Sequence, residues 1–139
     1  MQAPRQNKIV ESAAQAAAII RAELPKVQNE ERVFVLPLDA NGKVLAKPIL
    51  VSVGHQDGKA AIDAGAIFRE ALKAGAEEII VAHNHPSGDP MPSKADVAAT
   101  RELKDLASRL GVVLIDHIII GADDSACGAG FTSLSESAL

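Results

Sequence analysis

The feature that most constrains the fold of this chain is a short apolar run that ends in a pair of histidines. Residues 78–82 form this run between Gly75 and Pro86, and it is too short for a helix. A run of this kind, bounded by glycine and proline, predicts a buried strand. Because side chains two residues apart point to the same side of a strand, we expect His83 and His85 to present their imidazoles on one face.

A carboxylate follows the histidines across a loop stiffened by prolines. Asp96 lies eleven residues beyond His85, and the loop between them contains Pro86, Pro90 and Pro92. Two neutral imidazole nitrogens and one carboxylate, with a fourth position left for water, make up the ligand set of a catalytic zinc site rather than a structural one. The spacing therefore favours a metal centre with an open coordination position.

The same residues also allow a purely structural explanation. Ser93 and Asp96 stand three residues apart before a helical pattern, which is close to the spacing of a capping box. On that interpretation they only begin a helix, and the two histidines are satisfied polar residues at a strand end. The combination of a His-x-His pair, an acidic helix start and a stiff link favours the metal site over this alternative.

Hydrophobic periodicity along the rest of the chain predicts an α/β fold of three layers, with a mixed sheet flanked by helices. The predicted helices cover 10–24, 64–72 and 93–110, and the remaining strands cover 33–38, 44–53, 112–120 and 131–134. We expect residues 1–29 to form an N-terminal helical extension and residues 30–139 to form the main domain. The alanine-rich face of the first helix packs either on this domain or, in a homodimer, on a second copy.

Composition excludes several classes of function. The net charge is −4 and the chain has no Tyr or Trp, so we expect no nucleic-acid binding from this domain. Its one cysteine, Cys127, cannot form a disulfide framework or the Cys-x-x-Cys pair of a zinc deaminase. No apolar stretch approaches the ~18 residues of a membrane span, and no secretory signal is evident. We therefore expect a cytoplasmic protein.

The segments 83–88 and 92–96 together resemble the signature of the RadC branch of the JAB/MPN metalloenzymes. The wider JAMM pattern of that family is an upstream Glu, then His-x-His, seven residues, Ser, two residues and Asp. In this chain the seven residues are 86–92, so the spacing fits. The resemblance extends to the family's opening strand, its central helix and its closing segment, which correspond here to 31–39, 67–72, 116–121 and 131–134.

This resemblance implies a JAB/MPN-like domain with the activity of a zinc-dependent metallopeptidase. Such an enzyme cleaves a peptide or isopeptide-like amide with a metal-activated water, so its partner is a protein or peptide substrate. His83, His85 and Asp96 would bind Zn²⁺. The alternative is a non-catalytic metal-binding module, used for interaction and associated with DNA processing or mobile elements.

The resemblance also suggests roles for two further residues. Glu31 would act as the general base that accepts the proton of the attacking water. Ser93 would hydrogen-bond the oxygen of the tetrahedral intermediate. Glu30 is an alternative base that the sequence does not exclude. His117 is expected in a strand, either as a core histidine or as a hydrogen-bonding partner of a metal ligand.

Overall fold

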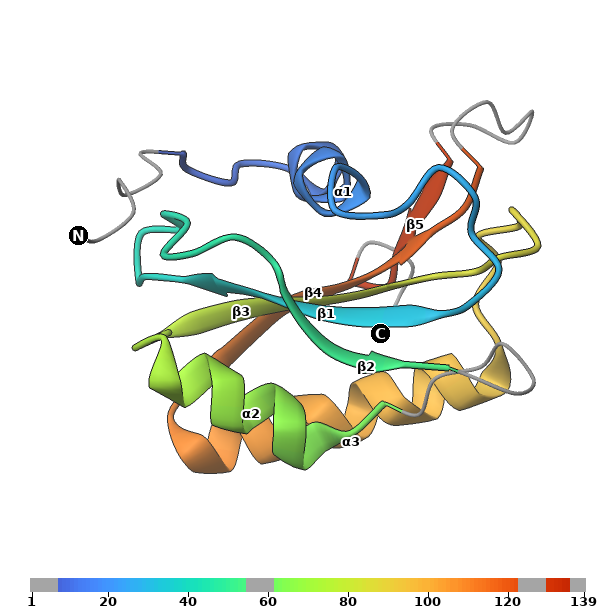
Figure 1. The fold of residues 1–139 in the computed structure, drawn as a ribbon. Helices are drawn as coiled ribbons and strands as arrows, with labels where there is room; N and C mark the ends of the chain where they lie inside the picture. Colours follow the sequence, from blue (N-terminus) through green and yellow to red (C-terminus); the bar gives the residue numbers. More distant parts are fainter. Residues whose placement is uncertain (1–7, 55–61, 123–129, 136–139) are drawn as a thin grey trace.

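Three layers make up the molecule, with one mixed sheet between α1 on one face and α2 and α3 on the other (Figure 1). The computed structural model describes residues 8–54, 62–122 and 130–135. This architecture confirms the predicted fold class. The elements are α1 (Ala13–Arg21), β1 (Arg32–Leu38), β2 (Ile49–Val53), α2 (Ala64–Lys73), β3 (Glu78–Asn84), α3 (Lys94–Leu110), β4 (Val113–Ile120) and β5 (Phe131–Ser133).

The strand order of the sheet is β2-β1-β3-β4-β5. Strands β3 and β4 are parallel, and α3 forms the crossover between them, whereas the other neighbouring pairs are antiparallel. A crossover helix between parallel strands begins near the end of the strand that precedes it. The N-terminus of α3 is therefore brought back to the end of β3, where the histidines lie.

Both faces of the sheet are buried, and the residues of β1 alternate between them. Phe34 and Leu36 belong to the apolar cluster under α1, while Val33 and Val35 belong to the cluster under α2 and α3. Aromatic residues make up only 2% of the chain, so aliphatic side chains fill most of both clusters. On the other side of the first cluster, α1 contributes buried residues such as Ile20, which confirms packing of its apolar face on the domain.

Local signals set the helix ends. Ser12, Asp63 and Ser93 cap the N-termini of α1, α2 and α3 with side-chain oxygens that accept backbone N–H groups. Helix α3 ends at Gly111, whose φ of 73° is in the left-handed region that favours glycine. No helix within the described ranges is long and apolar enough to cross a membrane.

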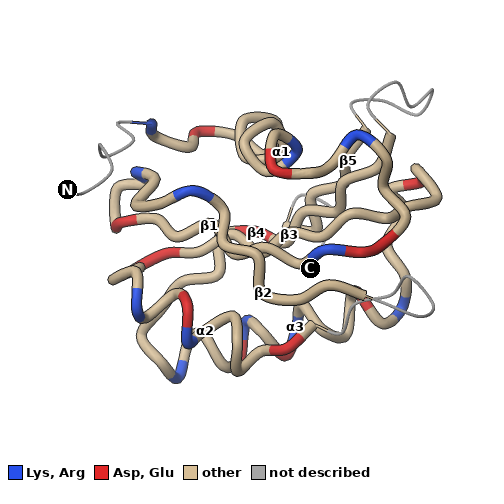
Figure 2. Tube along the Cα trace, in the orientation of Figure 1, with Lys and Arg blue, Asp and Glu red and all other residues tan. Residues whose placement is uncertain are grey.

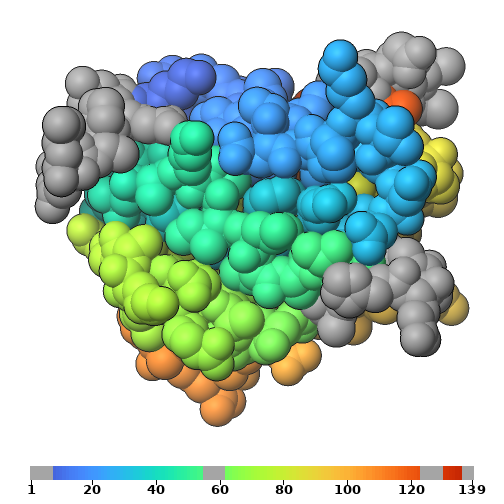
Figure 3. Space-filling model, in the orientation of Figure 1, coloured from blue at the N-terminus to red at the C-terminus, as the bar shows by residue number. Residues whose placement is uncertain are grey.

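The strand predicted over 44–53 is regular only from Ile49. Val44 forms an isolated bridge with Leu38, and the chain then leaves the sheet until Val35 pairs with Ile49. Pro48 lacks the N–H that a continuous ladder requires at that point. Figure 3 shows this part of the chain, in blue-green, filling the surface between α1 and α2.

Charged side chains lie on the helices and loops more than in the sheet. Figure 2 shows Lys and Arg interspersed with Asp and Glu along these segments. In this view, basic and acidic residues are not separated onto different sides of the molecule, and the net charge is only −4.

Candidate metal centre

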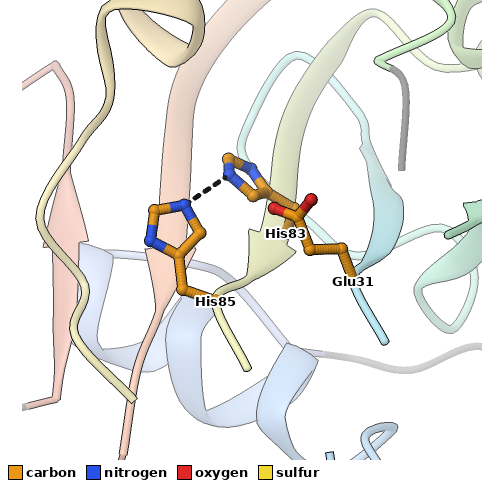
Figure 4. A group of neighbouring side chains, drawn as sticks. All are labelled: Glu31, His83 and His85. Carbon is orange, nitrogen blue, oxygen red and sulfur yellow. Dashed lines mark hydrogen bonds between the residues drawn. The ribbon is translucent and has the colours of Figure 1, made fainter. Parts of the chain in front are cut away.

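The last residues of β3 and the first turn of α3 bring three predicted ligands together. His83 is the last residue but one of β3, His85 follows the strand, and Asp96 lies at the third position of α3. His83 and Asp96 are buried, and His85 is partly exposed. The two imidazoles face each other as predicted from their spacing (Figure 4).

The facing atoms of these residues are spaced as tetrahedral ligands are. The Nε2 atoms of His83 and His85 lie 3.2 Å apart. One carboxylate oxygen of Asp96 is 3.2 Å from Nε2 of His83, and the other is 3.2 Å from Nε2 of His85. Ligand atoms held tetrahedrally at about 2.0–2.1 Å from an ion lie about 3.3 Å from one another. Each separation is close to this value, with a different Asp96 oxygen next to each histidine nitrogen, so the three side chains are close enough to share a small divalent ion.

Glu31, the residue directly before β1, faces this cluster. Its carboxylate and the ring nitrogens of His83 and His85 lie within 4.8 Å of one another, in a grouping that could hold a metal ion (Figure 4). The register explains this position, because Val33 pairs with His83 and residues two apart on β1 share a face. Glu30 lies on the alternate face, where its carboxylate is 3.9 Å from Arg32.

Asn84, the residue between the two histidines, fixes the chain on both sides of Glu31. Its side-chain oxygen accepts the N–H of Arg32 at 2.7 Å, and its amide donates to the carbonyl of Glu30 at 3.1 Å and to Gln28 at 3.1 Å. Asn84 is 1% exposed, so these bonds form away from competing water. This role of Asn84 could not be predicted from the sequence, because its partners lie more than fifty residues earlier in the chain.

Ser93 and Asp96 form the capping box that the structural explanation predicted. The Ser93 hydroxyl accepts the N–H of Asp96 at 3.0 Å, and the Asp96 carboxylate accepts the N–H of Ser93 at 2.9 Å. The carboxylate also faces both histidines, so helix capping and a metal site are compatible here. The Ser93 hydroxyl accepts in this bond and keeps its own proton for donation.

The loop between His85 and Asp96 is attached to the ends of β4 and β5. The Ala122 N–H donates to the carbonyl of Gly88 at 2.8 Å, and the Thr132 hydroxyl donates to that of Pro90 at 2.7 Å. Gly121 lies directly under the loop, where a Cβ atom would come within 2.5 Å of the Gly88 oxygen and 2.8 Å of Cδ of Pro90. Only glycine allows this approach.

A chain of polar contacts continues behind His83, away from His85. Nδ1 of His83 is 2.9 Å from Nε2 of His117, and Nδ1 of His117 is 2.6 Å from the Thr100 hydroxyl. His117 is fully buried, as expected of a core histidine, and it also contacts the candidate ligand His83, whereas Thr100 was not anticipated. His117 could be noticed in the sequence because it is an isolated histidine in the apolar run 112–120. Thr100 lies in an amphipathic helix, where a threonine gives no signal of this kind.

Burial and hydrogen bonding set the charges in the cluster. Burial by itself raises the pKa of Asp96, but hydrogen bonds from His83 and His85 outweigh it and hold that pKa well below its usual range. The hydrogen bond to Asp96 raises the pKa of His85 above its ordinary 6.5, against the effect of burial. Burial, followed by the proximity of His83, lowers the pKa of His117 to about 3, so its ring is neutral at pH 7.

A groove with a volume of about 530 Å³ opens beside His85. It runs between the segment after α1 and the loop that follows β3. The described residues that line it are Arg21, Leu24, Pro25, Lys26, Gln28, His85, Pro86, Gly88, Gly121 and Ala122. A bound chain in this groove would lie against one of the candidate ligands.

The fold and the cluster together define an α/β domain with a candidate metal centre at the end of its central strand. Residues 10–138 match the RadC-like JAB domain family. The chain therefore belongs to this family, which confirms the resemblance found in the sequence.

The relatives of this chain include proteins named UPF0758 from several bacteria. One from Carboxydothermus hydrogenoformans is 45% identical over 94 residues, which are 68% of this chain and 41% of the relative. One from Acaryochloris marina is 39% identical over 133 residues, which are 96% of this chain and 51% of the relative. The chain thus spans about half the length of the curated relatives it matches.

The pKa shifts of His85 and Asp96 predict how the protein behaves with pH when a chelator is present. The folded pKa of His85 is above 6.5, so its contribution to stability is full below pH 6.5 and is lost as pH rises through the folded pKa. The folded pKa of Asp96 is below its ordinary 3.8, so its contribution is full above that pH and is lost under stronger acid. His117 acts in the opposite sense to His85, because its folded pKa of about 3 is below the ordinary 6.5 and its contribution is lost as pH falls from 6.5 toward 3. We therefore expect the free energy of unfolding to be largest close to pH 6.5.

Thermal denaturation in EDTA across this pH range measures the effect. In the His85→Gln variant, which lacks the titrating ring, the decline above pH 6.5 should flatten. An equally steep decline in the variant would contradict the assignment to His85.

Removal of the Asn84 side chain should destabilise the start of β1. Asn84→Ala leaves the buried N–H of Arg32 and the carbonyl of Glu30 without these bonds, which costs about 1–3 kcal/mol. Denaturant titration measures the loss. The exposed Asn29 in the same connection provides the matched control, because Asn29→Ala should change the free energy of unfolding by less than about 0.5 kcal/mol. Equal effects of the two substitutions would contradict the role of Asn84.

Proposed function

We propose that this domain is a zinc-dependent metallohydrolase of the JAMM type, which cleaves a peptide or isopeptide-like amide. The observation that carries the proposal is the set of three 3.2 Å separations among His83, His85 and Asp96. Membership of the RadC-like JAB domain family supports it. The proposal concerns this domain alone, since the chain matches only about half of each relative.

His83, His85 and Asp96 would hold the ion. Two imidazole nitrogens and one carboxylate suit zinc, and three protein ligands leave one position open. Zinc at such a site lowers the pKa of a water toward ~7 and polarises a carbonyl group. The remaining tasks belong to side chains of this protein.

Glu31 is the proposed general base. Its carboxylate faces the same cluster as the histidine nitrogens, within 4.8 Å, and the bonds of Asn84 hold the backbone on both sides of it. A carboxylate in this position accepts the proton of the attacking water and passes it to the departing amine as the C–N bond breaks. Proton transfer of this kind contributes about 10²–10⁴ in rate.

Ser93 is the proposed hydrogen-bond donor to the amide oxygen. It adjoins the cluster through its capping bond with Asp96, and its hydroxyl proton is not used in that bond. Negative charge develops on the amide oxygen during attack, and a donor placed there before reaction stabilises it. The groove beside His85 is the proposed site for the protein or peptide substrate.

A closed metal site is the second candidate function. Glu31 lies close enough to the histidine nitrogens to be grouped with them as a possible ligand. If Glu31 bound the ion together with the other three residues, the tetrahedral set would be complete and no position would remain for water. The domain would then be a metal-stabilised interaction module rather than a hydrolase.

The metal site is tested by the zinc content of purified protein. We expect close to one equivalent of zinc per chain by elemental analysis. His83→Ala and Asp96→Asn should each lose most of it, because two remaining ligands bind zinc weakly. Asp89→Asn is the matched control, since Asp89 is an exposed residue of the same loop and should keep full zinc content. Equal zinc content in Asp96→Asn and wild type would refute the site.

Glu31→Gln separates the hydrolase from the closed site. A general base is dispensable for zinc binding, so the variant should keep its zinc and lose about 10²–10⁴ in the rate of cleavage of a peptide-amide library. Glu30→Gln is the control and should leave both quantities unchanged. Loss of zinc from Glu31→Gln would favour the closed site, and loss of activity only from Glu30→Gln would reverse the assignment of the base.

A further inference from the structure

A closed ring of contacts links two of the candidate ligands through residues that do not face the metal position. The ring runs from His83 to His117 at 2.9 Å, from His117 to Thr100 at 2.6 Å, and from the Thr100 hydroxyl to the backbone carbonyl of Asp96 at 2.8 Å. The Asp96 side chain closes it at His83. His117 is fully buried and Thr100 is 3% exposed, so water does not compete for these contacts.

The protons on the Thr100 hydroxyl, on His117 and on Nδ1 of His83 take directions that follow from one carbonyl group. A carbonyl oxygen only accepts, so the single proton of the Thr100 hydroxyl points to the carbonyl of Asp96. Toward His117 the hydroxyl is then an acceptor, and Nδ1 of His117 must carry a proton. A neutral imidazole has one N–H, so Nε2 of His117 is an acceptor and Nδ1 of His83 donates to it.

In the neutral, metal-binding form of His83, a proton on Nδ1 leaves Nε2 with a lone pair that points to the metal position. His85 reaches the same state by a different route, because its Nδ1 lies 3.0 Å from the carbonyl oxygen of Asp89, which also only accepts. In the neutral form that binds a metal, both histidines thus turn their Nε2 lone pairs toward the metal position. Both histidines are therefore held in the Nδ1–H tautomer, His83 by the ring of His117 and His85 by the carbonyl of Asp89.

We propose that His117 and Thr100 are positioning residues that hold His83 in the Nδ1–H tautomer and so keep its Nε2 ready to bind the metal. This inference rests on the proposed zinc site. Partners of this kind, which orient a ligand histidine through its second nitrogen, affect metal affinity by about 10–100-fold. Thr100 has a further part, since its hydroxyl bonds the backbone of the residue that supplies the carboxylate ligand.

Thr100→Val tests the proposal with the smallest change in shape. It removes the acceptor for Nδ1 of His117, which frees that ring to carry its proton on Nε2 instead. His83 would then have to accept at Nδ1 and carry its own proton at the metal position. We expect zinc affinity to fall about 10–100-fold, as measured by competition with a chromophoric chelator.

Thr100→Ser and Ser133→Ala are the matched controls. Thr100→Ser keeps the hydroxyl and should keep near-wild-type affinity. Ser133→Ala removes a hydroxyl of similar burial, which donates to Asp116 rather than to the ring, and should leave zinc affinity unchanged. His117→Gln offers an amide oxygen in place of Nε2 and should retain more affinity than His117→Phe, which has no acceptor.

Nitrogen NMR of the zinc-free protein provides a readout that does not depend on the metal. The chain has only four histidines, so their ring nitrogens can be assigned by substitution. We expect His117 to carry its proton on Nδ1 in the wild type and on Nε2 in Thr100→Val. Circular dichroism and thermal denaturation establish that each variant is folded.

The outcomes separate the two proposals. Wild-type affinity in folded Thr100→Val, or a proton on Nε2 of His117 in the wild type, would overturn the positioning role. If the wild type binds no zinc but His117 has the expected tautomer, the proposed metal function fails and the proton arrangement of the ring is upheld. Reduced affinity in Thr100→Val together with the tautomer change supports both.

Discussion

A single carboxylate joins the start of α3 to the end of β3. Asp96 accepts the N–H of Ser93 in the capping box and also faces the Nε2 atoms of both histidines. The first role fixes the side chain relative to the helix, and the second fixes the helix relative to the sheet. An ionised carboxylate this deeply placed requires several partners, and the parallel β3-α3-β4 crossover is what supplies them from two different elements.

The residues of the candidate centre that are close in sequence could be predicted, because local geometry places them. The two-residue period of a strand put His83 and His85 on one face, and the capping pattern put Asp96 in a first helical turn. The loop between them is short enough to limit where the helix can begin. Their meeting within 3.2 Å agrees with the spacing that suggested a ligand set.

The residues that come from distant parts of the chain could not be predicted with the same certainty. The choice between Glu30 and Glu31 depends on the pairing of Val33 with His83, which is fixed by the sheet as a whole. The contact of Thr100 with His117 depends on how α3 crosses β4. Likewise, the predicted strand over 44–53 followed its apolar pattern but not the lost hydrogen bond at Pro48.

Four polar residues contact the backbone or the side chains of the cluster. Asn84 orders the backbone around Glu31, and Ser93 orders Asp96. His117 and Thr100 stand behind His83 in the same manner. Asn84, His117 and Thr100 are buried and have hydrogen-bonding partners in or beside the cluster, so the polarity of the centre extends well into an aliphatic core.

The close approach of Gly121 to the loop above it has a thermodynamic consequence. The Gly88 oxygen and the Pro90 ring rest on a residue without a side chain, and hydrogen bonds from Ala122 and Thr132 hold the same part of the loop against the sheet. Ordering one backbone residue costs about 1–2 kcal/mol, and here that cost falls on folding rather than on association. A ligand that meets this loop therefore encounters a surface already in its final shape, and its binding free energy is not spent on arranging the protein.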